Sequence, residues 1–452
     1  MSERGMRGLR RSLVLGLLGL AAVAMAGTAA PAAESEGASA TPSGPLTLDE
    51  CALIALHNSP QIISAAQSVT SARAALTGAT SAYYPQIAVS ASEAVAGTGA
   101  SSSGGVERTE EADLSLRQTL WRSGLRESVE ESAARLRSAE LTYLTAVQGL
   151  VQQVASDYYA TLAAERLTQV AEVGVEAAKG HLAQVQARIQ LGATPEVDKF
   201  TAEADLARAE LDLIDAQTNH KVALARVKTT MGVPVETSLE LATPSPVGQA
   251  LSPEAELPAL PQALETARAR RPEILGAREV VAASRSALRQ AEIQRGPATE
   301  VGGRYNAGLT DWESHGSTWD LSLTLSWPLF DGNATAAQVT SARASRLRAE
   351  ADLQRTINEA GLDVESALAR AERASARITV TARSVAAAEA RLRAAEGKYQ
   401  EGVGILLEVT DARTAYSSAL ADQIQAEYDY RTALIAVQKA LGTLAPPQAE
   451  EK

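Results

Sequence analysis

The residue types most often used for catalysis are few in this chain and lie far apart. Among its 452 residues there are one cysteine, Cys51, and four histidines. The histidines are His57, His181, His220 and His315. No HExxH, CxxC, nucleophile-elbow or phosphate-loop pattern surrounds any of them. We therefore expect no enzyme, no cofactor and no metal site, and we interpret Cys51 as a small core residue.

One pair of carboxylates has a spacing that could matter. Glu408 and Asp411 are three residues apart, so they share a face if this segment is helical. By itself, the pair is sufficiently explained by a helix start, because the helix dipole favours acidic residues there.

The N-terminus carries the pattern of an export signal. Four arginines precede a short apolar run from Leu13 to Val23, and Ala24-Met25-Ala26 follows it. This pattern predicts a signal peptide at residues 1–26, with alternative cleavage sites up to residue 33. Residues 27–45, rich in Ala, Ser, Gly and Pro, are interpreted as a flexible leader.

The charge balance bears on the partners. The full chain has a formal net charge of −12. Because nucleic acid is itself polyanionic, a chain this acidic is not expected to bind it.

The chain repeats itself at an offset of about 210 residues. Pro60 matches Pro272, Gly192 matches Gly402, and Met231-Gly232 matches Leu441-Gly442. We infer a first repeat at 46–232, a Pro-rich linker at 233–259, a second repeat at 260–444 and a flexible tail at 445–452. The period is far longer than that of solenoid repeats.

Each repeat contains a very long helix. In the second repeat a helix is expected from about Thr335 to Tyr399. Within it, apolar residues recur every seven positions from Ile357 to Tyr399, with mostly alanine on the alternate seam. About 65 residues at 1.5 Å rise each would extend roughly 100 Å. A helix of this length predicts an elongated bundle, a coiled coil or a helical tube.

Strands are expected between the short and the long helices. Alternating apolar and polar residues predict strands at about 85–95 and 112–122, and again at about 297–307 and 318–329. Past the signal no apolar run is long enough for a membrane-spanning helix. Since small barrels begin at about eight strands, four strands could span a membrane only if several subunits shared one barrel.

The tryptophans support a membrane-facing role for these strands. They are Trp121, Trp312, Trp319 and Trp327, all in or beside the strand regions. Such clustering is typical of an interfacial aromatic belt. Packing in an ordinary core is the alternative.

Several phrases, in order and in both repeats, resemble the TolC-like outer-membrane efflux proteins over about residues 46–444. The phrases are Leu46-Thr47-Leu48-Asp49-Glu50, Tyr84-Pro85-Gln86-Ile87, Leu323-Thr324-Leu325-Ser326-Trp327-Pro328-Leu329-Phe330-Asp331-Gly332, Lys398-Tyr399 with Gly402, and Ala440-Leu441-Gly442.

The resemblance implies a mainly α fold with a small β part, built from a duplicated helix–strand–strand–helix–helix unit. It implies a homotrimer with an α-helical periplasmic tunnel and a shared 12-stranded β-barrel in the outer membrane of a Gram-negative-type bacterium. Such a protein would be the exit duct of a tripartite efflux or type I secretion system. It would work with a periplasmic adaptor protein, an inner-membrane transporter and outer-membrane lipid, and the sequence does not specify its cargo.

The resemblance also assigns roles to residues. Glu408 and Asp411 match an acidic ring in the pore, and such a ring favours cations. Tyr399 and Asp198 match a closing contact, although simple packing also explains Tyr399. A basic residue expected two places after the second hairpin glycine is replaced by Gly404, which puts the rest of that gate in doubt.

The adaptor would dock at the tips of the two hairpins. The matching residues are Gly192, Ala193 and Thr194 in the first tip and Gly402, Val403 and Gly404 in the second. A secreted or periplasmic coiled-coil scaffold or adhesin without a pore is the alternative, since the heptads fit it equally well.

Overall fold

The computed structural model describes residues 44–97, 106–192, 195–243, 257–310 and 313–446. The expected signal peptide at 1–26 therefore lies outside the described residues. So do almost all of the leader at 27–45, the middle of the linker at 233–259 and most of the tail at 445–452.

The described part is mainly helical, with one small antiparallel sheet. The first repeat contains α2 (Leu48–Asn58), α3 (Pro60–Ser81), β1 (Gln86–Gly97), β2 (Val106–Arg122), α4 (Leu125–Gln190) and α5 (Val197–Thr230). The second contains α7 (Leu260–Arg270), α8 (Pro272–Ile293), β3 (Ala298–Thr310), β4 (Glu313–Ser326), α9 (Ala334–Gln400) and α10 (Leu406–Ala440).

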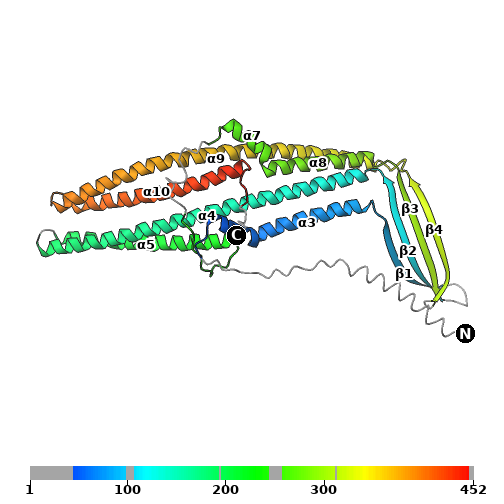
Figure 1. The fold of residues 1–452 in the computed structure, drawn as a ribbon, viewed down its shortest axis with the longest axis horizontal. Coiled ribbons are helices and arrows are strands. Elements are labelled where there is room, and N and C mark those ends of the chain that lie inside the picture. Colours follow the sequence, from blue (N-terminus) through cyan, green and yellow to red (C-terminus); the bar gives the residue numbers. More distant parts are fainter. Residues whose placement is uncertain (1–43, 98–105, 193–194, 244–256, 311–312, 447–452) are drawn as a thin grey trace. The chain divides into compact units, whose positions relative to one another are not determined.

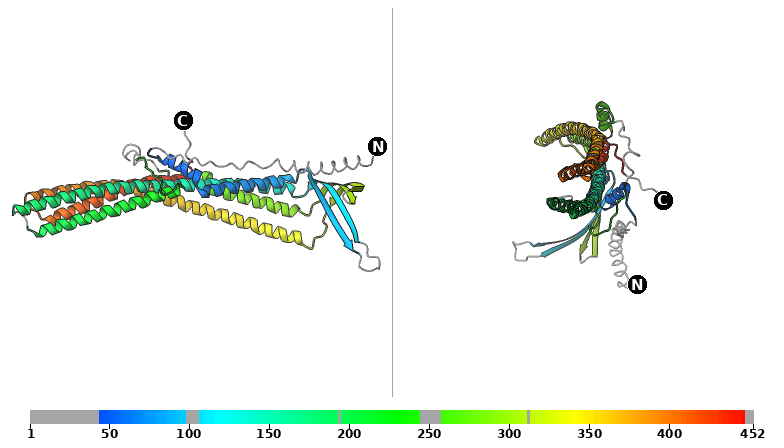
Figure 2. Two further views of the ribbon diagram at one scale, coloured as in Figure 1. Left: turned by 90° about the horizontal axis from the view of Figure 1, so that it is seen from below. Right: turned by 90° about the vertical axis from the view of Figure 1, so that its left-hand side faces the viewer.

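The helices run side by side, with the sheet at one end of them and the α4/α5 and α9/α10 turns at the other (Figures 1 and 2). α4 packs on α5, α8, α3 and α10, and α9 packs on α10 and α8. α4 has 66 residues and α9 has 67. At 1.5 Å per residue each extends about 100 Å, so the two turns lie far from the sheet.

The same proline break separates the first two helices of each repeat. Pro60 and Pro272 stand at the first helical positions of α3 and α8, where the missing N–H costs nothing. The residues before them, Ser59 and Arg271, are extended, with ψ of 120° in both, because proline disfavours the helical region for its predecessor. α2 begins with a capping box between Thr47 and Glu50.

The sheet has the strand order β1-β2-β3-β4, so β2 and β3 join the two repeats. At the β1/β2 and β3/β4 connections the strands are longer than the alternating sequence pattern predicts. Backbone hydrogen bonding between neighbouring strands continues there beyond the end of the side-chain alternation. Ile87 pairs with Leu116, and Gly303 pairs with both Leu116 and Leu321, which places these side chains on one face.

This apolar face is exposed in the single chain. Its described members include Ile87, Val89, Val95, Leu114, Leu116, Tyr305, Trp319, Leu321, Leu323 and Leu325. The other face is polar: Asn306 donates to Asp113 at 3.0 Å, and Arg117 pairs with Glu300 at 2.9 Å. The sheet is thus amphipathic, with its apolar side uncovered.

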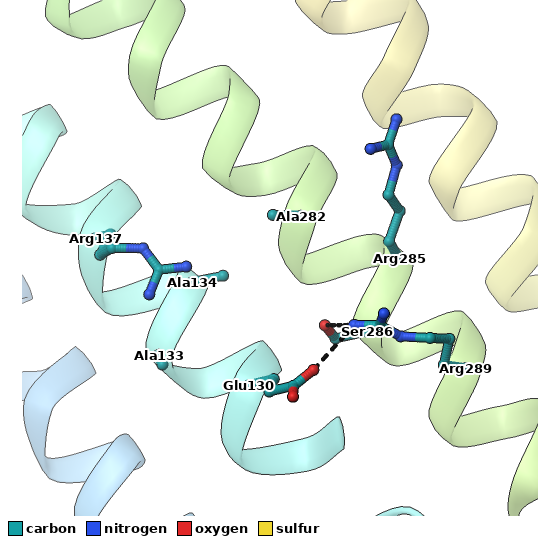
Figure 3. A pocket seen from close by; sticks show the side chains of 8 residues that line it. All are labelled: Glu130, Ala133, Ala134, Arg137, Ala282, Arg285, Ser286 and Arg289. Carbon is teal, nitrogen blue, oxygen red and sulfur yellow. Dashed lines mark hydrogen bonds and ion pairs between the residues drawn. The ribbon is translucent and has the colours of Figure 1, made fainter. Parts of the chain in front are cut away.

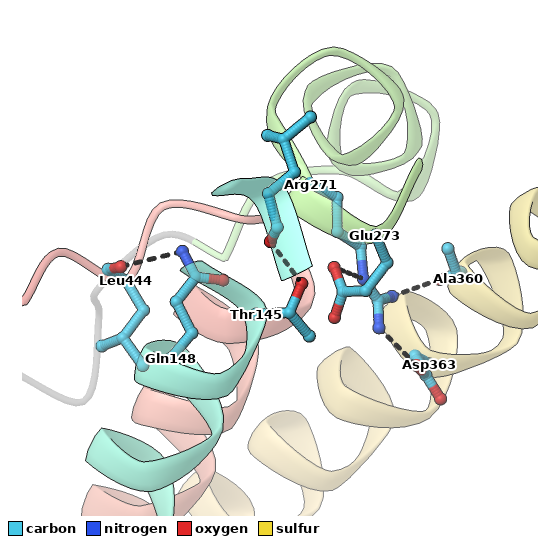
Figure 4. Close-up of polar contacts among 8 residues, drawn as sticks. Thr145, Gln148, Arg271, Glu273, Ala360, Asp363 and Leu444 are labelled. Atoms are coloured by element: carbon cyan, nitrogen blue, oxygen red, sulfur yellow. Dashed lines mark hydrogen bonds and ion pairs between the residues drawn. The ribbon is translucent and has the colours of Figure 1, made fainter. Parts of the chain in front are cut away.

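Side chains near the middle of the helices hold the second repeat together and tie it to the first (Figure 4). The buried Arg271, at the α7/α8 break, donates to the Ala360 carbonyl at 3.3 Å and to the Asp363 carboxylate at 2.6 Å. The Gln148 amide of α4 donates to the Leu444 carbonyl at 3.0 Å. At this level the α7/α8 break is thus held to α9 within the second repeat, and the end of the second repeat is held to α4 of the first.

Cys51 lies fully buried in the largest apolar cluster, as a core residue would. Burial, with a smaller contribution from the Glu50 carboxylate, raises the pKa of its thiol to about 12. The thiol is therefore neutral and unreactive at physiological pH.

The duplicated glycines explain how each repeat closes on itself. Gly442, with φ of +71°, packs so closely on the α7/α8 break that a Cβ would lie 2.7 Å from the Arg271 Cα. Its counterpart Gly232, with φ of +67°, would place a Cβ 3.0 Å from the Asn58 Cβ at the α2/α3 break. Only glycine accommodates both the left-handed backbone and the contact.

We expect Gly442→Ala to destabilise the protein by at least about 2 kcal/mol, since both the backbone and the contact would be strained. The matched control is Gly174→Ala inside α4, where nothing lies within 4 Å of the added Cβ. That change should stabilise the helix by about 0.5–1 kcal/mol. Thermal unfolding midpoints of the purified proteins measure both effects, and a Gly442→Ala midpoint equal to wild type would contradict the close-packing argument.

Candidate functional site

The predicted tip residues lie at the two hairpin turns farthest from the sheet. Gly192 and Gly402 have φ of 68° and 79° and follow the ends of α4 and α9. Val403 is exposed, whereas a Cβ on Gly404 would come within 2.9 Å of the Lys398 Cβ. Ala193 and Thr194 lie outside the described residues. The docking role of these tips stays a prediction.

Glu408 and Asp411 lie near the start of α10 and are exposed. Between and beside them, Leu406, Val409 and Ala412 are buried in a cluster that includes Tyr399. The helix therefore turns its apolar residues toward this chain's own core and both carboxylates away from it. This orientation is compatible with the predicted acidic ring, which stays a prediction.

Tyr399 is buried near the end of α9. Its ring lies 5.7 Å from the His181 ring and 4.8 Å from the Arg188 guanidinium carbon, both on α4. Its phenolic oxygen is buried and has no hydrogen-bond partner among the described residues. The predicted contact with the half-buried Asp198 is thus not among the hydrogen bonds of the described residues, and it stays a prediction.

Arg188 is a residue that the sequence reasoning did not single out. One guanidinium nitrogen donates to the Tyr399 carbonyl at 2.8 Å, and the other donates to the Gln400 carbonyl at 3.1 Å. In the sequence, Arg188 is noticeable only as a basic residue four positions before the first tip glycine. An arginine on an exposed helix face is common, so this position alone did not indicate a role.

Further polar contacts cross between helices near the tip. The Thr410 hydroxyl on α10 donates to Asp205 on α5 at 2.7 Å. Arg413 on α10 donates to Glu396 on α9 at 2.9 Å. Together with Arg188, these bonds connect all four helices of the two hairpins.

His181 lies buried among these groups, and in the part of the chain that the structure describes its Nε2 atom has no hydrogen-bond partner. Burial, and to a smaller degree the nearby Arg413, lowers its pKa below the ordinary value of about 6.5. Asp205, Glu396 and Asp198 oppose this shift without overcoming it. The imidazole is therefore neutral at physiological pH.

A second polar group lies between α4 and α8, where a pocket of about 340 Å³ opens (Figure 3). Its arginines are paired: Arg289 with Glu130 at 2.9 Å and Arg137 with Glu279 at 2.8 Å. Arg285 pairs with Glu350 of α9 at 3.4 Å. Because these pairs are partly exposed, each contributes at most about 1 kcal/mol, and we interpret them as links between helices.

Three of the four tryptophans can be placed. Trp121, Trp319 and Trp327 are exposed, and Trp312 lies outside the described residues. Exposed tryptophans beside an apolar sheet face are what a membrane-interface belt requires, and this role stays a prediction.

Two further features are absent from the described residues. No helix in those ranges is long and apolar enough to cross a membrane. Within the same ranges, no group of three or more His, Cys, Asp or Glu side chains could hold a metal ion.

Comparison with known proteins gives consistent matches. A sequence model of the family described as "Outer membrane efflux protein" matches residues 53–233 and 263–443. The chain is 28% identical to Protein CyaE of Bordetella pertussis over 88% of this chain and 84% of that protein. It is 23% identical to Outer membrane protein TolC of Vibrio cholerae, over 86% and 89% respectively.

A solved structure has the same fold. The open state of the Neisseria gonorrhoeae MtrE outer membrane channel aligns with a TM-score of 0.76 at 20% identity. The alignment covers 89% of this chain and 91% of that chain.

The position of His181 predicts a pH-dependent stability. Because folding lowers its pKa, its contribution is complete above the unfolded value of about 6.5 and is lost as the pH falls toward the folded value. We expect the unfolding midpoint of wild type to fall more than that of His181→Phe between about pH 8 and about pH 5. The control is His57→Phe at an exposed site. Equal pH dependence of wild type and His181→Phe would contradict the assignment.

Proposed function

Because the chain belongs to the outer membrane efflux protein family, we propose that three copies form one exit duct of a tripartite efflux or type I secretion system. The protein is an outer-membrane channel that extends into the periplasm, and it is not an enzyme. In the proposed assembly it conducts cargo passively, and energy comes from its partners.

The structure of the sheet is the observation that supports a trimer. Among the described strands, β1 and β4 each have one unpaired edge, and the apolar face is exposed. In lipid, every backbone N–H and C=O must find a protein partner. Pairing β4 of one copy with β1 of the next satisfies both edges, and three copies of four strands close a twelve-stranded barrel.

The long helices supply the rest of the duct. With 66 and 67 residues, α4 and α9 extend about 100 Å. They place the hairpin tips at the periplasmic end, where we propose that an adaptor protein docks on Gly192, Ala193, Thr194, Gly402, Val403 and Gly404. The adaptor in turn connects the duct to an inner-membrane transporter.

At the same end we propose the acidic ring of Glu408 and Asp411. Both carboxylates point away from the chain's own core, so three copies would contribute six of them around the narrow entrance. We keep Tyr399 and Asp198 as proposed contacts of the closed state.

The coiled-coil scaffold is the weaker candidate. A scaffold needs no amphipathic sheet with an exposed apolar face, and family membership supports the duct instead. Reconstitution tests the proposal: purified protein added to a planar lipid bilayer should produce discrete conductance steps. Particles imaged in detergent should have threefold symmetry and a lumen, whereas solid rods without conductance would favour the scaffold.

The acidic ring makes a separate prediction. Glu408→Gln with Asp411→Asn should shift the cation-to-anion permeability ratio toward one, because carboxylate rings select cations electrostatically. The matched control is Asp212→Asn with Asp215→Asn, two exposed carboxylates of α5 with the same spacing. Unchanged selectivity in the first variant, measured from reversal potentials in a salt gradient, would rule out the ring.

A further inference from the structure

Near the tip, one side chain reaches across from the first hairpin to the second. Arg188 lies in the last turn of α4 and is half-buried. Its two terminal nitrogens donate to the carbonyl oxygens of Tyr399 and Gln400, at 2.8 and 3.1 Å. Its guanidinium also lies over the Tyr399 ring, 4.8 Å from the centroid. Three contacts from one residue therefore hold the end of α9.

The acceptors are the carbonyls that a helix end leaves without helical partners. Lys398 O accepts from the N–H groups of Val403 and Gly404, and Tyr399 O accepts from Gly402 N. Arg188 adds a second donor to Tyr399 O and reaches Gln400 O. A cation at this position is also favoured by the helix dipole.

These bonds are stronger than ordinary surface contacts. A guanidinium that donates to carbonyls forms charge-assisted hydrogen bonds, and stacking on an aromatic ring adds a cation–π contribution. Partial burial reduces screening by solvent and salt. Because the acceptors are backbone atoms, the contact fixes the position of the helix end itself rather than that of a flexible side chain.

The position makes this contact mechanically important. α4 packs mainly on α5, α8, α3 and α10, and α9 packs mainly on α10 and α8. Contact between α4 and α9 near the tip comes from Arg188 and from the His181–Tyr399 ring pair. Elsewhere the two hairpins meet through α10, which packs on α4 and whose Thr410 donates to Asp205 of α5. Arg188 therefore acts on the end of α9 in particular.

We infer that Arg188 is an intrachain latch: it holds the α9/α10 tip against α4 in the closed state, and opening of the duct requires its release. This inference rests on the proposed function for its consequence, conduction. Its structural content, the coupling of the two hairpins, stands independently. Arg188 acts on the entrance through the position of α9, so it is a positioning residue.

Two substitutions test the latch. Arg188→Ala removes all three contacts. Arg188→Lys keeps the charge on a single donor nitrogen but loses the planar guanidinium that reaches both carbonyl oxygens. The matched control is Lys179→Ala, on the same helix, where the exposed ammonium bonds only to Glu176 one turn away. Thermal midpoints of all variants establish that each is folded.

The first measurement is the distance between the hairpins, which needs no channel activity. Spin labels on Leu191→Cys and Val403→Cys, both exposed positions, are introduced into Cys51→Ala full-length protein and diluted with unlabelled copies. We expect Arg188→Ala to broaden the distance distribution or shift it to longer values. Arg188→Lys should be intermediate and Lys179→Ala unchanged. An unchanged distribution in folded Arg188→Ala would overturn the latch.

The second measurement is conductance in a planar bilayer. Loss of the latch should raise the open fraction about tenfold, which corresponds to about 1.4 kcal/mol. Wild-type conductance in Arg188→Ala would overturn the role in gating. If wild type itself forms no channel, the proposed function fails, and the spin-label distances still decide whether Arg188 couples the hairpins.

Discussion

The edge strands of a sheet present backbone N–H and C=O groups that need partners, and lipid supplies none. In this protein β1 and β4 are such edges, beside an exposed apolar face that includes Leu321 and Leu323. The sheet of one chain is therefore incomplete in a membrane. The proposed trimer follows from this constraint, and the helices that continue from the strands inherit its symmetry.

From the sheet the helices carry the chain to a remote end. Polar contacts and close packing hold α4 and α9 against the neighbouring helices near the middle of their length. Arg271 ties the α7/α8 break to α9, and Gly442 closes the second repeat on the same break. At the far end a buried cluster that includes Tyr399 and Val409 lies beside the polar contacts of Arg188, which join the end of α9 to α4.

The long helices and their proline breaks were predictable because their signals are local. Seven-residue periodicity up to Tyr399 and a proline at position 272 act within a few turns of the chain. Arg188 was not predictable, since an arginine on a helix surface is ordinary. The placement of Glu408 and Asp411 was predictable only in part. Their spacing predicted a shared helix face, but the direction of that face away from the core depends on how Val409 and Ala412 pack.

Short-range patterns repeated along the chain encode the duplicated unit, the helix and strand segments, and the family. Which groups meet depends instead on the packing of distant segments. Arg188 and Tyr399 are 211 residues apart, and their contact depends on the relative rotation and shift of two helices about 100 Å long. Small changes in this rotation or shift cannot be predicted from local helix propensity, yet they determine which partners the tip residues have.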